Sequence, residues 1–112
     1  MPNFEVGDVV KVPFPYTDRA TRQRRPALVV SAGSIEDAHG LLWVLMITSA
    51  ENRGWPGDVA ITELAKTGLP MASIIRTAKI ATIEARDAEH LGKVSAAVMA
   101  QVGQRLAATL GI

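Results

Sequence analysis

Arginine is the residue type in this sequence best suited to chemistry on a phosphate. Eight of the twelve basic residues are arginines, and Arg19, Arg22, Arg24 and Arg25 fall within seven positions. A guanidinium offers a planar fork of donors to phosphate oxygens and stays charged at any working pH. Arg25 directly precedes Pro26 and an apolar run, so we expect it at a strand entry, where a fixed charge can stabilise a transition state. The alternative is a solvated loop that protects an edge strand from aggregation.

Four further positions carry polar or aromatic groups with more than one interpretation each. Thr48 and Ser49 end the apolar run 41–47, and hydroxyls there can bind phosphate, cap a turn or bond their own backbone. Trp55 can stack on a base or anchor its own loop. Arg76 can pair with a carboxylate or contact a phosphate. Residue types alone leave these interpretations open at each position.

Several other chemistries are excluded. The chain has no cysteine, which rules out a disulfide scaffold, a thiol nucleophile and a Cys-ligated metal. His39 and His90 are not spaced as metal ligands, and we expect both to be ordinary surface or turn residues. No phosphate-binding glycine loop, dinucleotide fingerprint or G-x-S-x-G motif occurs. We therefore expect neither a metal site nor another cofactor.

Length and composition fit one small folded domain. The chain has 112 residues, of which 48% are hydrophobic and 21% charged. This apolar content is enough for residues 1–112 to form one hydrophobic core without disulfides or a structural metal. The longest apolar stretch, 41–47, is far shorter than the roughly 20 residues of a membrane-spanning helix. The first residues do not resemble a secretory signal, so we expect a cytoplasmic protein.

The charge is distributed unevenly. The net charge of +1 argues against promiscuous, long-range binding to nucleic acid. However, half of the arginines lie between residues 19 and 25, whereas residues 94–112 contain one charged side chain, Arg105. This arrangement is compatible with a short nucleic acid segment held at one basic site.

Hydrophobic patterns predict short strands followed by a helix. The expected strands are residues 8–16, 26–34, 41–49, 59–61, and 73–76 with 79–85 as two strands or one bent strand; the expected loops are 17–25 and 50–58, with a turn over 37–40. Asp87 could cap a short turn. The result is a mostly β fold, a small SH3-like antiparallel barrel closed by a C-terminal helix.

The C-terminal helix is expected over residues 93–110, where valine and leucine recur every four positions from Val94 to Leu110. Its outer face carries Ala, Met, Ser, Thr and Gln instead of the usual charges. That face is either an Ala-rich solvated surface or a contact with a partner subunit.

The sequence resembles the MazF/PemK family of toxins from about residue 4 to 108. The resemblance rests on an ordered set of segments: GDVV (7–10), VPFPYTD (12–18), RPALVVS (25–31), ITS (47–49), DVAI (58–61), GL (68–69), SIIR (73–76) and KI (79–80). It implies the toxin of a type II toxin–antitoxin pair, a growth inhibitor and mRNA interferase. Such a toxin is a sequence-selective, metal-independent endoribonuclease, whose 2′-OH attack on single-stranded RNA leaves 2′,3′-cyclic phosphate and 5′-OH ends.

The same resemblance assigns roles to residues. It implies that Arg25 and Thr48 are catalytic, while the arginine at position 76 is catalytic or RNA-contacting in some members. Some members use an aspartate two positions beyond that arginine, but Ala78 stands there in this chain, so we favour Arg25 and Thr48. The residues expected to bind RNA are Thr17, Asp18, Arg22, Arg24, Ser49, Trp55, Ser73 and Arg76.

The implied partners are a second copy and an antitoxin. Members form homodimers with RNA in a groove between subunits, and the helix over 94–110 is our candidate for part of that contact. We expect an acidic C-terminal antitoxin segment over the loops 17–25 and 50–57, with DNA binding only through the antitoxin complex.

Two alternative functions remain. One is a gyrase-poisoning toxin like the CcdB family, which ends in Trp-Gly-Ile where this chain has Leu110-Gly111-Ile112. The other is a catalytically silent SH3-like interaction module.

Overall fold

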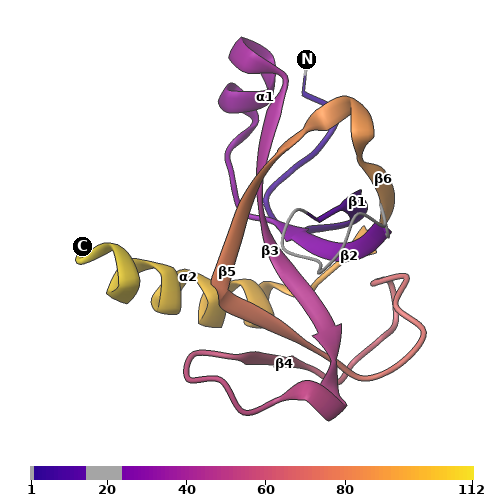
Figure 1. Ribbon diagram of the computed structural model, residues 1–112, viewed down its shortest axis with the longest axis vertical. Helices are drawn as coiled ribbons and strands as arrows, with labels where there is room; N and C mark the ends of the chain where they lie inside the picture. The colour runs from indigo at the N-terminus through magenta and orange to yellow at the C-terminus, as the bar shows by residue number, and fades with distance from the viewer. Residues whose placement is uncertain (1, 15–23) are drawn as a thin grey trace.

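The computed structural model describes residues 2–14 and 24–112, in which six antiparallel strands form one curled sheet with the order β4-β5-β3-β2-β1-β6 (Figure 1). The expectation of a mostly β, small antiparallel barrel with a C-terminal helix is confirmed, with the six strands curled into a half-barrel. The elements are β1 (Asp8–Pro13), β2 (Arg24–Val29), α1 (Gly33–His39), β3 (Leu41–Ser49), η1 (Ala50–Asn52), β4 (Val59–Ile61), β5 (Ser73–Glu84), η2 (Ala85–Asp87), β6 (Glu89–Lys93) and α2 (Ala96–Leu110), of which η1 and η2 are single 3₁₀ turns.

Alternate side chains of each strand serve two separate cores, as the period of two in a strand dictates. In β3, Leu42 and Val44 pack into a first core with residues of β1, β2 and β5. Leu45 and Ile47 face the other side and form a second core. Val102 of α2 is fully buried in this second core, so the C-terminal helix closes that side of the sheet.

Strand β5 is one bent strand, which settles the choice left open by the sequence. Leu45 of β3 pairs with Ile80, whereas the next residue, Met46, pairs with Arg76. Residues 77–79 are therefore extra on β5 and form a bulge. A bulge bends its strand and redirects the neighbouring side chains, here towards the loop over residues 50–58.

The segment 33–39 is helical, so the prediction of a strand through residue 34 was wrong. Strand β2 stops at Val29, and α1 ends at His39 with Gly40 as its C-cap, whose φ of +67° is the left-handed conformation that glycine adopts readily. The carboxylate of Glu36 accepts hydrogen bonds from the backbone N–H groups of Asn3 and Phe4. These bonds join α1 to a segment over thirty residues away in sequence.

Three boundaries and one expected cap also differ from the prediction. Strand β1 ends at Pro13 and β2 begins at Arg24, so both arginines before Pro26 belong to a strand instead of a loop. Asp87 ends η2 and caps nothing, because residues 89–93 form the edge strand β6 beside β1. Helix α2 starts at Ala96, because the hydroxyl of Ser95 accepts the N–H of Val98 as an N-cap.

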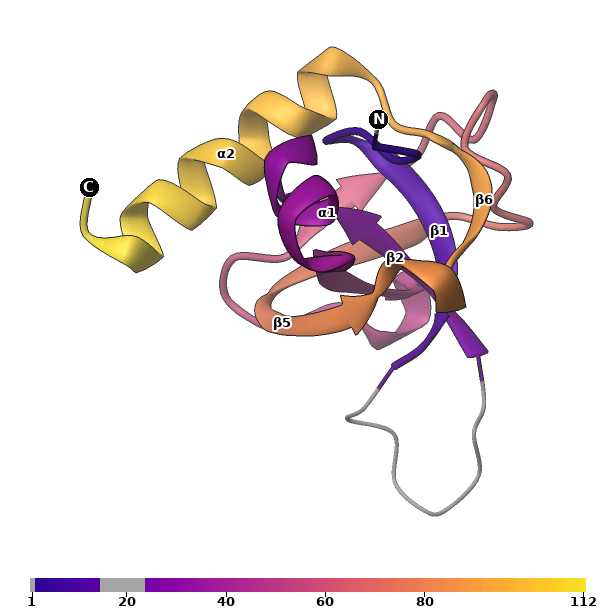
Figure 2. The same ribbon diagram turned by 90° about the horizontal axis from the view of Figure 1, so that it is seen from above.

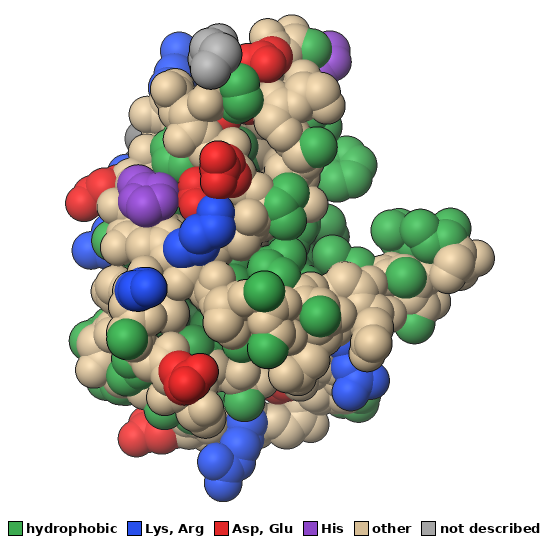
Figure 3. Space-filling model, turned by 180° about the vertical axis from the view of Figure 1, so that it is seen from behind, with side chains coloured by type: hydrophobic (Ala, Val, Ile, Leu, Met, Phe, Trp, Pro, Cys, Tyr) green, Lys and Arg blue, Asp and Glu red, His purple; other side chains and the backbone are tan. Residues whose placement is uncertain are grey.

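Helix α2 extends away from the sheet with its C-terminal half (Figure 2). Leu110 and Ile112 are 68% and 90% exposed. Seen from behind, hydrophobic side chains gather in the angle between the projecting helix and the rest of the molecule (Figure 3). No helix among the described residues is long and apolar enough to cross a membrane.

Candidate functional site

Arg25 and Thr48 lie on the same face of the sheet, at the same end of two neighbouring strands. Ala27 of β2 pairs with Met46 of β3, and two further steps along each strand lead to Arg25 and Thr48. Alternation places both on the face of the first core, since Ala27 and Met46 pack there. Arg25 is partly buried and pairs with Val12 on its other side, which confirms its position at a strand entry.

The hydroxyl of Thr48 is held by a residue of the following turn. Asn52, the last residue of η1, donates from Nδ2 to Thr48 Oγ1 at 2.9 Å. The neighbouring Ser49 has the capping role, because its Oγ accepts the backbone N–H of Glu51 at 3.3 Å. Of the two strand-end hydroxyls, one therefore caps a turn and the other bonds to a side chain.

Arg76 forms a buried ion pair with Asp58. Its Nε donates to Asp58 Oδ1 at 3.2 Å and its Nη2 to Oδ2 at 3.1 Å, and the two side chains are 8% and 9% exposed. The register explains the meeting: Val59 pairs with Ile75, so the residue before β4 lies opposite Arg76. Nη2 also donates to the carbonyl oxygen of Asn52 at 2.6 Å.

Trp55 anchors its loop and still keeps an exposed ring. The guanidinium carbon of Arg76 lies 4.4 Å from the ring centroid and Lys79 Nζ lies 5.5 Å from it, both within the range of cation–π attraction. Even so, 45% of the residue is exposed. The anchoring role is thus observed, and ring surface remains on which a base could stack.

The loop over residues 53–58 is fixed by a tight turn. The N–H of Asp58 donates to the carbonyl of Trp55 at 3.1 Å, with Pro56 and Gly57 (φ +89°) between them, the residue preferences of a type II turn. The carbonyl of Gly57 accepts from Thr77 Oγ1 at 2.9 Å. The loop is consequently attached to the bulge of β5.

The other predicted RNA-binding residues are placed differently. Arg24 is exposed, and its Nη2 donates to the carbonyls of Lys11 and Asp87. Ser73 is buried opposite Ser49 and donates to the carbonyl of Met71. Three predicted residues lie outside the described part of the chain: Thr17, Asp18 and Arg22.

The two histidines lie apart from the contacts among Thr48, Asn52, Trp55, Asp58 and Arg76. His39 is exposed at the end of α1, and Nε2 of His90 lies 3.6 Å from Asp8 Oδ1 on β1. Within residues 2–14 and 24–112, no three His, Asp or Glu side chains gather closely enough to hold a metal ion together.

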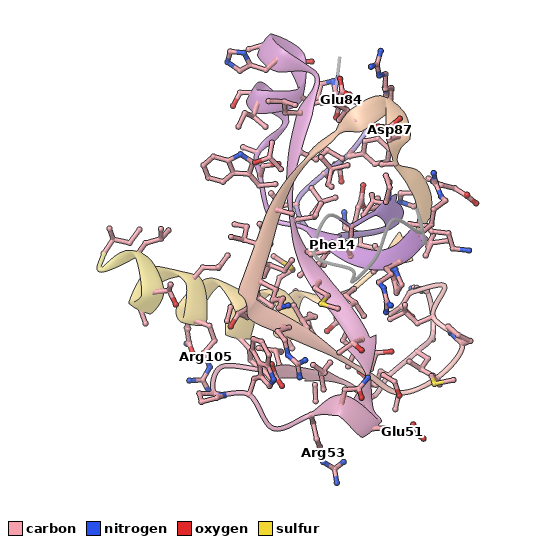
Figure 4. The ribbon with its side chains drawn as sticks, in the orientation of Figure 1. Phe14, Glu51, Arg53, Glu84, Asp87 and Arg105 are labelled. Atoms are coloured by element: carbon pink, nitrogen blue, oxygen red, sulfur yellow. The ribbon has the colours of Figure 1, made fainter. Side chains whose placement is uncertain are left out.

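Sequence reasoning missed Asn52, Asp58 and Arg53. Asp58 follows a Trp-Pro-Gly run and directly precedes a strand, which was a usable signal for a turn residue aimed back at the sheet. Asn52 and Arg53 had no such signal. Glu51 and Arg53 lie at the end of the molecule formed by η1, with the Arg53 side chain directed away from the body (Figure 4).

The arrangement suits recognition of a nucleic acid strand. A partly buried guanidinium and a strand-end hydroxyl on one face are donors for phosphate oxygens. The exposed ring of Trp55 and the cation of Arg53 lie in the adjoining loop.

Comparison with known proteins points to one family. The family model of PemK-like, MazF-like toxins of type II toxin–antitoxin systems matches residues 5–110. No curated protein sequence matches the chain significantly.

Solved structures give the same picture. A MazE–MazF crystal structure from Deinococcus radiodurans is 27% identical, covers 96% of this chain and 95% of its own, and superposes with a TM-score of 0.75. A crystal structure of MazF alone from that organism is 26% identical, covers 96% of each chain and superposes with a TM-score of 0.76. An endoribonuclease from Mycobacterial species, in complex with its cognate antitoxin, is similar in fold. It is 21% identical, covers 100% of this chain and 97% of its own, and superposes with a TM-score of 0.75.

Proposed function

This chain belongs to the PemK-like, MazF-like toxins of type II toxin–antitoxin systems, and from that premise we propose that it is an endoribonuclease that cleaves single-stranded RNA without a metal ion. The observation that carries the proposal is the placement of Arg25 and Thr48. Their strands run in register to the same end of the sheet, and both side chains belong to one face. A phosphodiester placed there meets two donors fixed by the sheet.

The reaction is an internal transfer. The ribose 2′-oxygen forms a bond to phosphorus while the bond from phosphorus to the 5′-oxygen breaks, which leaves a 2′,3′-cyclic phosphate and a 5′-hydroxyl. One proton leaves the 2′-hydroxyl and one reaches the departing oxygen, so protons balance. The enzyme's task is to orient the internal nucleophile and to stabilise the charge on the phosphorane.

The two residues divide that task. Arg25 donates to the non-bridging oxygens of the phosphorane, where its planar fork matches two oxygens at once. The hydroxyl of Thr48 fixes the scissile phosphate or passes on a proton. The loss of one such donor costs roughly 10²–10³ in rate.

The surrounding residues hold the RNA strand on either side of the cleaved bond. Trp55 stacks on a base with its exposed ring. We assign the remaining RNA contacts to the other residues expected from the sequence: Thr17, Asp18, Arg22, Arg24, Ser49, Ser73 and Arg76.

The assembly consists of two copies of the chain and, in the inhibited state, the antitoxin. The exposed apolar side chains of Leu110 and Ile112, at the C-terminal end of α2, support a contact between copies there. An acidic antitoxin segment over the loop 50–57 would cover Arg53 and Trp55 and so exclude RNA.

The test is incubation of the purified protein with a long unstructured RNA in the presence of EDTA. We expect discrete cuts whose 5′ ends accept labelled phosphate directly and whose 3′ ends are cyclic. Arg25→Ala should lower the cleavage rate by roughly 10²–10³-fold, whereas Arg86→Ala, a change at an exposed arginine of η2, should leave it unchanged. Full activity of Arg25→Ala, or loss of cleavage with EDTA, would refute the proposal.

A further inference from the structure

Asn52 is bonded at both its side chain and its backbone to residues of the candidate site. Its Nδ2 donates to Thr48 Oγ1 at 2.9 Å, and its carbonyl oxygen accepts from Arg76 Nη2 at 2.6 Å. Asn52 is exposed, so neither bond is a by-product of burial in a core. An exposed side chain directed back onto a strand-end hydroxyl instead of into water has a specific partner.

The bond from Asn52 determines what the hydroxyl of Thr48 can do. A threonine hydroxyl has one proton to donate and lone pairs with which to accept. An amide N–H can only donate, so one of the two lone pairs of Thr48 Oγ1 accepts from Asn52 and the hydroxyl proton points elsewhere. Thr48 is thereby presented as a donor, the state needed to bind a phosphate oxygen.

Asn52 is itself held in place from the opposite side. Arg76 donates a hydrogen bond to the backbone carbonyl of Asn52, and Arg76 is held in turn by both carboxylate oxygens of Asp58. Ser49 caps the turn η1 that carries Asn52 at its end. These contacts hold the backbone of Asn52 relative to β3 and β5, which keeps its side chain within reach of Thr48 before any substrate arrives.

We propose that Asn52 is a positioning residue that turns the hydroxyl of Thr48 towards the scissile phosphate, with Arg76 and Asp58 acting through Asn52. The inference rests on the proposed RNA cleavage, in which Thr48 contacts the phosphate. It gives Arg76 a role without direct contact with the reacting atoms. It also assigns a function to two residues, Asn52 and Asp58, that the sequence did not single out.

The kinetic test is a double-mutant cycle measured on RNA cleavage under single-turnover conditions. Asn52→Ala should lower the maximal rate about 10- to 100-fold, as misorientation of a reacting group does, with an RNA concentration dependence close to that of the wild type. In a Thr48→Val background, Asn52→Ala should change nothing further, because the hydroxyl it orients is gone. Asn3→Ala, the same change at the other asparagine of the chain, should retain the wild-type rate.

Asn52→Asp distinguishes orientation from simple packing. The carboxylate has nearly the shape of the amide but can only accept, so the hydroxyl of Thr48 must turn towards it and away from the phosphate. We expect a lower maximal rate than in Asn52→Ala. A rate for Asn52→Asp near that of the wild type, or equal losses from Asn52→Ala in both backgrounds, would overturn the proposal.

A second readout does not depend on RNA cleavage. In amide NMR spectra, the side-chain NH₂ signals of Asn52 should shift and exchange faster with water in Thr48→Val, whereas those of Asn3 should stay in place. Unchanged Asn52 signals would overturn the inference even if the protein cuts RNA. Shifted signals in a protein that cuts no RNA would retain the contact and refute the proposed function instead.

Discussion

Both carboxylate oxygens of Asp58 accept hydrogen bonds from the guanidinium of Arg76, and each side chain is less than one-tenth exposed. A buried pair of this kind is costly to break, because removal of one charge leaves the other uncompensated. Asn52 and Trp55 depend on the same guanidinium. The pair therefore links the stability of the fold to the geometry of the loop.

Asp58→Asn should strongly destabilise the protein. The charge of Arg76 would remain buried without its counter-ion, and we expect the free energy of unfolding to fall by about 3–5 kcal/mol. Equilibrium unfolding in urea measures this change in the free energy of unfolding. Glu84→Gln is the matched control, since Glu84 pairs with Arg86 at 53% and 78% exposure and such a pair contributes about 0–1 kcal/mol. Equal losses in both variants would show that the buried pair carries no special weight.

Arg25→Lys should lose most of the cleavage rate although the charge is kept. An ammonium is a point charge and cannot form the two parallel bonds of the guanidinium fork. We expect a decrease of about 10²-fold in rate with an unchanged circular dichroism spectrum. A rate near that of the wild type would mean that Arg25 supplies charge alone.

The strand pattern was predictable from the sequence because it depends on local periodicity. Thr48 directly follows the apolar run 41–47, and β3 ends one residue after it. Similarly, the sequence placed Arg25 beside an apolar strand, and the structure makes it part of β2. The positions of both candidate catalytic residues at strand ends therefore follow from local patterns in the sequence.

Contacts between distant segments were not predictable in the same way. Helix α1 is tied to the N-terminal segment by Glu36, more than thirty residues from its partners. Strand β6 approaches the loop beside it so closely that a Cβ on Gly92 would lie 2.3 Å from the carbonyl oxygen of Lys66. The pairing of Asp58 with Arg76 needs the register of β4 on β5. No local pattern encodes these distances.

Gly57→Ala should disturb the turn that holds the loop to the bulge. Gly57 has φ +89°, and an added Cβ would lie 2.9 Å from Thr77 Oγ1, so the variant is strained in both backbone and side chain. We expect a loss of about 1–3 kcal/mol in stability together with slower RNA cleavage. Gly103→Ala in α2, where no atom lies within 4 Å of the new Cβ, should stabilise by about 1 kcal/mol. Thermal unfolding compares the two.

Lys93 should make stability depend on pH in the alkaline range. Its hydrogen bond to Glu5, with the charge of Asp8 nearby, raises the pKa of Lys93 above the ordinary 10.5. A raised pKa in the folded state means that the contribution is full below the unfolded-state pKa and is lost as pH rises through the folded-state value. Between about pH 9 and about pH 12, the wild type should lose more stability than Glu5→Gln. Parallel curves of stability against pH for the wild type and Glu5→Gln would contradict a stabilising contribution from Lys93.

The exposed end of α2 should control association without controlling folding. Val102 is fully buried within one chain, whereas Leu110 is 68% exposed, so a charge at position 102 would unfold the protein and test nothing about a second copy. Leu110→Glu leaves the core intact but places a carboxylate on the apolar end of the helix. If two copies meet there, the charge would be desolvated at the contact.

We therefore expect Leu110→Glu to elute as a monomer on sizing at concentrations where the wild type elutes as a dimer, with thermal unfolding of the monomer little changed. Gln104→Glu, which adds the same charge at another exposed position of α2, shows whether any acidic substitution on the helix has this effect. A dimer that persists in Leu110→Glu would place the contact between copies on another surface. Since RNA is proposed to bind between two subunits, a monomeric Leu110→Glu should also cleave RNA more slowly, although Arg25 and Thr48 are untouched.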